Sequence, residues 1–85
     1  MNGNGNMSPT VLRKKGYRFF FFSREETRKH VHIYSENGEA KFWLEPEIEL
    51  AKNHRFTRLE LKQIENIIEE YYECFTDAWR KHFKS

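Results

Sequence analysis

The stretch KHVHIYSENGEAKFWLEP, residues 29–46, decides the fold of this chain. Its two ends, residues 29–34 and 39–45, are rich in β-branched and aromatic side chains, which favour strands. Between them stands Asn37-Gly38, and both residue types accept the positive φ that a type I′ hairpin turn requires. The stretch therefore predicts a β-hairpin with its turn at Asn37-Gly38.

Further strands are expected on both sides of this hairpin. GYRFFFFSR, residues 16–24, is strongly aromatic and ends in polar residues, which is typical of a strand. Pro46 closes the hairpin, and after it Ile48 and Leu50 alternate as in a short strand, although the glutamates of residues 47–56 would also suit a helical turn. We favour the strand, so the sequence predicts a three- to four-stranded antiparallel sheet, mainly a meander.

Residues 58–83 contain no proline or glycine and follow a helical pattern. Thr57 and Glu60 have the T-x-x-E spacing of a capping box, which marks a helix start. Apolar residues then recur at steps of three and four, the period of one helix face: Leu61, Ile64, Ile68, Tyr71, Phe75 and Ala78. The chain is therefore expected to be an α+β domain with a long C-terminal helix packed on one face of the sheet.

The expected helix is longer than the expected strands, and it can cover only one of the two faces of the sheet. The helix would span about 39 Å and the strands only about 20 Å, so the helix overhangs the sheet, or it breaks near Glu69–Glu73 and folds back. Apolar side chains also alternate onto both sides of the strands, and one helix covers only one side. The other side must be covered by the folded-back helix, by a second copy or by a different protein.

Composition indicates one small domain of 85 residues with a net charge of +2. Residues 1–8 are expected to be a disordered lead-in, and residues 9–85 to form the domain. Up to residue 34, seven Lys and Arg stand against two Glu, whereas eight Lys and Arg stand against eleven acidic residues in the remainder of the chain.

Cys74 is the single cysteine, which excludes an internal disulfide. No apolar run is long enough for a membrane span, so we expect a cytoplasmic protein with no membrane partner.

His30 and His32 should point to the same side of their strand. With Glu39 or His54 they could bind a metal ion, but a catalytic zinc needs three protein ligands, and a polar, solvent-facing strand side is the simpler interpretation. The sequence contains no nucleophile-elbow motif, no metalloprotease motif and no glycine-rich phosphate loop. We therefore expect no cofactor and no metal, and the sequence does not favour an enzyme.

Nucleic-acid binding is an alternative, because basic residues flank the aromatic strand and could neutralise phosphates while the rings stack on bases. The residues in question are Arg18, Arg24, Arg28 and Lys29. In this alternative the protein binds nucleic acid, or is an RNase-like toxin in which His30 and His32 carry protons.

From about Ser8 to Phe83 the chain resembles a prokaryotic family, the domain of unknown function numbered 4160. The resemblance is carried by GYRFFFFSRE, by the His-x-His followed by Tyr34, by GEAKFWLEP and by the closing AWRKHF. Many members have Asn-Pro-Pro-His-x-His where this chain has ETRKHVH. The resemblance implies a small cytoplasmic protein from an operon that looks like a toxin–antitoxin module, with a small protein from a neighbouring gene as its partner.

A protein-interaction module is therefore the preferred function, and its partner would be that neighbouring gene product or a second copy of the chain. We expect the uncovered aromatic side of the sheet and the end of the helix to form the interface, since aromatic residues dominate interface energetics. The expected anchors are Phe20, Phe22, Trp43 and Trp79.

Overall fold

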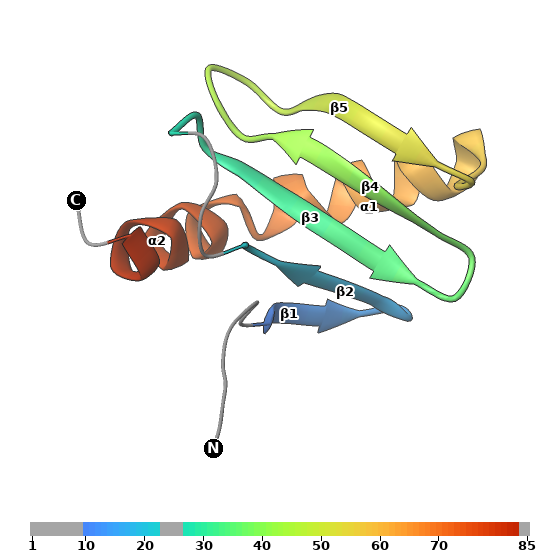
Figure 1. Ribbon diagram of the computed structural model, residues 1–85, viewed down its shortest axis with the longest axis horizontal. Coiled ribbons are helices and arrows are strands. Elements are labelled where there is room, and N and C mark those ends of the chain that lie inside the picture. Colours follow the sequence, from blue (N-terminus) through green and yellow to red (C-terminus); the bar gives the residue numbers. More distant parts are fainter. Residues whose placement is uncertain (1–9, 23–26, 84–85) are drawn as a thin grey trace.

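The computed structural model describes residues 10–22 and 27–83. The elements follow in the order β1 (Thr10–Lys14), β2 (Tyr17–Phe20), β3 (His30–Ser35), β4 (Gly38–Trp43), β5 (Glu49–His54), α1 (Arg58–Glu70) and α2 (Tyr72–Phe83). The strands form one antiparallel sheet in sequence order; in Figure 1, α1 lies behind the sheet and α2 continues to the left, past the ends of β3 and β4. The α+β class and the meander are thus confirmed, and the lead-in expected over residues 1–8 lies outside the described residues.

The expected sheet of three or four strands is too small, because residues 10–14 add a fifth strand at one edge. This strand, β1, joins β2 through a two-residue turn at Lys15-Gly16, whose φ angles of 54° and 84° are those of a type I′ turn. Sequence patterning misses β1 because Arg13 and Lys14 interrupt the apolar alternation that identifies a strand.

The predicted hairpin of β3 and β4 is confirmed, but its turn lies one residue earlier than expected. Ser35 pairs with Gly38, so the turn residues are Glu36 and Asn37, and neither Asn37 nor Gly38 has a positive φ. Close packing explains the glycine instead. A Cβ on Gly38 would lie 2.4 Å from the carbonyl oxygen of His54, at the end of β5.

The strand favoured for residues 47–56 is confirmed as β5, and it contains a bulge. Lys41 pairs with Lys52, whereas the next residue of β4, Phe42, pairs with Leu50, so Ala51 is the extra residue. The bulge turns Leu50 toward the helices with Phe42, and Lys52 toward the opposite face with Lys41.

The predicted capping box at the start of α1 is also confirmed. The Glu60 N–H donates to Thr57 Oγ1 at 3.1 Å, and the Thr57 N–H donates to Glu60 Oε1 at 2.8 Å. The Asn37 side chain donates to Glu60 Oε2 at 2.9 Å, which ties the β3–β4 turn to the helix start.

The single long helix expected for residues 58–83 is wrong, because the helix breaks at Tyr71, within the stretch where a break was considered. Beyond the break α2 does not fold back over the other face of the sheet. It continues on the same side as α1 (Figure 1), because Phe75 packs on Phe19 at 5.4 Å between ring centroids and Trp79 packs on Phe21 at 5.2 Å.

The core lies between the helices and the sheet. Its fully buried members come from both layers: Phe19, Phe21, Val31, Ile33, Leu44, Ile64, Ile68 and Phe75. Neither helix in the described part of the chain has the length and apolar character needed to cross a membrane.

Candidate binding surface

The face of the sheet that points away from the helices carries aromatic and basic side chains, and we call it the open face. Residues directly opposite each other on paired strands share a face, so the strand register defines three rows on it. The rows are Phe20–His32–Lys41–Lys52, Arg18–Tyr34–Glu39–His54 and His30–Trp43–Glu49.

Positive charge collects on the open face. Among the described residues, the strand register puts four Lys and Arg on this face against the two carboxylates of Glu39 and Glu49, a balance of +2. The four are Arg13, Arg18, Lys41 and Lys52. Arg28, which packs on Trp43, stands beside Glu45 and adds one charge of each sign. The face therefore has the electrostatic character of a site for an anionic partner.

Cations pack directly on the rings of this face. The guanidinium carbon of Arg18 lies 4.4 Å from the ring centroid of Phe20, and that of Arg28 lies 4.1 Å from Trp43. Lys41 Nζ lies 4.5 Å from the same Trp43 ring. Since the stems of these side chains shield apolar surface from water, the open face is less apolar than the strand alternation suggested.

His30 and His32 share a face as expected, with ring centroids 5.1 Å apart, but their surroundings differ. His30 is fully buried, its ring lies against Trp43 and Trp79, and its Nδ1 lies 2.6 Å from the Arg28 carbonyl oxygen. The interpretation of both histidines as solvent-facing is therefore wrong for His30. His30 therefore exposes no surface to an external substrate, whereas His32 is partly exposed.

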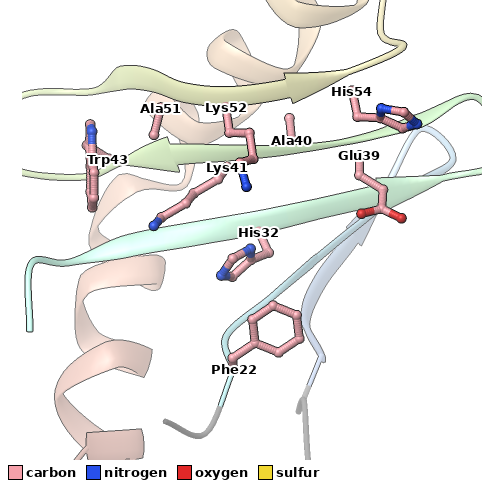
Figure 2. Close-up of a pocket in the computed structure, with 9 residues that line it drawn as sticks. All are labelled: Phe22, His32, Glu39, Ala40, Lys41, Trp43, Ala51, Lys52 and His54. Atoms are coloured by element: carbon pink, nitrogen blue, oxygen red, sulfur yellow. The ribbon is translucent and has the colours of Figure 1, made fainter. Parts of the chain in front are cut away.

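His32 occupies a different position, at the edge of a hollow. Its ring lies between Phe20 and Phe22, with centroids at 5.6 Å and 4.3 Å. The hollow has a volume of about 390 Å³ and lies over β3, β4 and β5 (Figure 2). It is lined by Phe22, His32, Glu39, Ala40, Lys41, Trp43, Ala51, Lys52 and His54.

The possible metal ligands are not gathered around the two histidines. Glu39 and His54 lie opposite each other on β4 and β5, in the row next to that of His32. Within residues 10–22 and 27–83, no group of three His, Cys, Asp or Glu side chains could hold a metal ion.

The four expected anchors do not lie on one surface. Phe20, Phe22 and Trp43 belong to the open face, and Phe22 has 41% of its surface exposed. Trp79 is only 5% exposed and packs between Phe21 of the sheet and Phe83 of its own helix. Trp79 is therefore a core residue and is not part of the open face.

The residues expected to bind nucleic acid do not all lie on the open face. Arg18 and Arg28 lie on the open face, whereas Lys29 precedes β3 and its backbone N–H donates to Glu45 Oε2 at 3.2 Å. Arg24 lies outside the described residues. The prediction from sequence did not include Lys41, although alternation within β4 places it on the same side as Trp43. It did not include Lys52 because that residue reaches this face only through the bulged pairing of β5 with β4.

Comparison with known proteins gives a family for the chain. The model of the domain of unknown function DUF4160 matches residues 16–80, a span that includes every row of the open face. No curated protein and no solved structure shows significant similarity. The resemblance noted in the sequence is thus confirmed at the level of the family, and the chain belongs to the DUF4160 family.

Proposed function

We propose that the chain binds single-stranded nucleic acid on the open face of its sheet. The observation that carries the proposal is the gathering of exposed aromatic rings and cations on one sheet face, which α2 contacts at His30. Phe22 and Tyr34 expose 41% and 49% of their surfaces, whereas Phe20 is only 9% exposed. Arg18 and Arg28 pack on the rings of Phe20 and Trp43 and bring positive charge to the same face. Aromatic rings stack on unpaired bases, and nearby cations neutralise the phosphates that connect them. A duplex hides the faces of its bases, so a single strand suits such a surface better.

The charge distribution supports nucleic acid over a protein partner. The centres of protein–protein interfaces are depleted in charged residues, and lysine in particular is depleted there. Here Lys41 lies on the inner strand β4 among aromatic rings, and Lys52 lies opposite it on the edge strand β5. A polyanion would compensate these charges, whereas an apolar partner would have to bury them at a cost.

The test is the affinity for a labelled single strand of about 10 nucleotides, measured by fluorescence anisotropy. We expect binding at about 50 mM salt and a loss of at least tenfold at about 200 mM, because each neutralised phosphate contributes about −0.7 to the logarithmic salt slope. Lys41→Gln should weaken binding and flatten that slope.

Lys62→Gln is the matched control, since Lys62 is an exposed lysine on α1, on the other side of the sheet. The proposal fails if no strand binds at low salt, or if Lys62→Gln weakens binding as much as Lys41→Gln does. A duplex of the same sequence should bind more weakly, because its bases are not available for stacking.

As a second candidate we propose a protein-interaction module of a toxin–antitoxin-like pair in a prokaryotic cytoplasm. Phe22 and Tyr34 support it, because 41% and 49% of their surfaces are exposed on the open face. The partner would be a small protein from a neighbouring gene or a second copy of the chain. The mass in solution, measured alone and with the neighbouring gene product, tests this candidate. A monomer that forms no complex contradicts it, and Phe22→Ser with Tyr34→Ser should abolish any complex that forms.

A further inference from the structure

We propose that the hollow on the open face is a subsite for one nucleotide of the bound strand. Lys41 and Lys52 hold the phosphate, and the ring of Phe22, supported by His32, stacks on the base. This inference rests on the proposed nucleic-acid function and deepens it. Figure 2 shows the arrangement, with Phe22 and His32 on one side of the hollow, Lys52 and His54 on the other, and Lys41 between them.

The positions of the two lysines support a phosphate site. Lys41 and Lys52 are directly opposite partners on β4 and β5, and like charges in that position repel and destabilise a sheet. His32 is the partner of Lys41 on the other side, so three basic side chains follow one another across β3, β4 and β5. A phosphate on this row turns the repulsion into attraction, because both ammonium groups then contact one anion.

The bulge in β5 also supports this site, because it directs Lys52 toward the hollow. Because Ala51 is the extra residue, Leu50 packs beside Phe42 on the helix side while Lys52 faces the hollow. A regular β5 with Leu50 opposite Phe42 would put Ala51 opposite Lys41 and would turn Lys52 to the other face. The irregular strand thus creates the lysine pair, and bulges often serve to direct a side chain into a site.

Phe22 is more accessible to a base than Trp43 is. Trp43 already packs against Arg28 and Lys41, whereas Phe22 keeps 41% of its surface exposed. Contacts with Phe20 at 5.4 Å and His32 at 4.3 Å hold the Phe22 ring in place, so little side-chain freedom is lost when a base stacks on it.

The size and the polarity of the hollow agree with the binding of one nucleotide. The volume of about 390 Å³ falls in the lower part of the range of roughly 300–1,000 Å³ for small-ligand sites. Glu39 also lines the hollow, in the row beyond the lysines and opposite His54. Its carboxylate repels the phosphate toward the lysine row and can accept a hydrogen bond from a base amino group or a sugar hydroxyl.

The experiment combines a titration with paired variants. Adenosine 5′-monophosphate is added to the isotope-labelled protein, and we expect shifts of amide signals in the residues that line the hollow. Adenosine without the phosphate should bind at least about fivefold more weakly, because its contacts to the lysines are missing. If adenosine binds as tightly, or if the shifts fall outside the hollow, the subsite is wrong.

The variants then test the two halves of the subsite with the oligonucleotide. Lys52→Gln should weaken binding and reduce the salt slope by about 0.7, the contribution of one phosphate. Phe22→Leu should weaken binding by about fivefold or more with the slope unchanged, since stacking is independent of salt. The controls are Lys62→Gln for the charge and Leu50→Ala for an apolar side chain of matched exposure, 42%, on the helix side.

The outcomes separate this inference from the function on which it rests. If the oligonucleotide binds but Lys52→Gln and Phe22→Leu behave like their controls, the subsite is wrong and the open face still binds nucleic acid. If adenosine 5′-monophosphate occupies the hollow but no oligonucleotide binds at low salt, the nucleic-acid function is wrong and the hollow is a site for small nucleotides. An amide spectrum of each variant confirms that its fold is intact.

Discussion

Arg28 packs on Trp43, with the guanidinium carbon 4.1 Å from the ring centroid, and so ties the start of β3 to the end of β4. The same side chain donates from Nε to the Glu45 carbonyl oxygen at 2.9 Å and lies 3.8 Å from a carboxylate oxygen of Glu49 in β5. One arginine therefore connects three neighbouring segments of the sheet at one corner of the open face.

Arg28→Ala should lower the free energy of unfolding by about 1–2 kcal/mol, because it removes a cation–π contact and a hydrogen bond to a backbone carbonyl. Arg28→Lys should recover only part of this loss, since an ammonium group cannot stack on the ring and reach the carbonyl with the same planar geometry. Urea denaturation followed by far-UV circular dichroism measures both, with Lys62→Ala on α1 as the control. An Arg28→Ala variant as stable as the Lys62→Ala variant would contradict the role given to Arg28.

Trp79→Ala should lower the free energy of unfolding by about 3–5 kcal/mol, the usual cost of removing a large aromatic side chain from a core. Phe22→Ala should cost about 1 kcal/mol or less, because its ring is partly exposed and loses only its contacts with Phe20 and His32. The two variants are compared in the same denaturation experiment. Similar costs would mean that Trp79 does not belong to the core.

Gly38→Ala should destabilise the protein by about 1–3 kcal/mol, because the added Cβ collides with the backbone at the end of β5. Gly16→Asn is the comparison, since Gly16 has a φ of 84° that asparagine tolerates and nothing lies within 4 Å of its would-be Cβ. Thermal unfolding compares the stabilities, and hydrogen exchange should be faster at the His54 end of β5 in the Gly38→Ala variant alone. Equal effects of both substitutions would refute the packing explanation for Gly38.

The pKa of Glu60 is held below its ordinary value of 4.5, chiefly by the hydrogen bond from the Thr57 backbone N–H and further by the side chain of Asn37. A lowered pKa means that the ionised carboxylate stabilises the folded state, so this contribution is present above pH 4.5 and is lost as the pH falls through the lower folded-state pKa. Glu60→Gln should therefore be less stable than the parent at neutral pH, and the difference should shrink in acid.

Denaturation midpoints at a series of pH values give this difference directly. Glu69→Gln, an exposed position on the same helix, controls for the loss of one negative charge. A Glu60→Gln difference that stays constant or grows in acid would show that the Glu60 carboxylate does not stabilise the helix start.

Features that depend on near neighbours in the chain follow from the amino-acid sequence alone. Thr57 and Glu60 form their capping box through bonds three residues apart, and the alternation around His30 and His32 identifies β3 because successive side chains of a strand point to opposite faces. The mismatch in length between helix and sheet leads to a break near Glu69–Glu73 as one of two expectations, and the break at Tyr71 agrees with it, whereas the folding back that was part of the same expectation does not occur.

Features that depend on which distant segments meet become visible in the three-dimensional structure. Arg13 and Lys14 interrupt the apolar alternation of β1, so its strand structure becomes evident only from its pairing with β2. The bulge at Ala51, which directs Lys52 to the open face, depends on the register of β4 with β5. In the same way, α2 buries Trp79 against Phe21, and His30 is enclosed between Trp79 and Trp43. The physical reason is that burial and charge neighbours come from pairing between distant segments, which residue spacing along one segment does not encode.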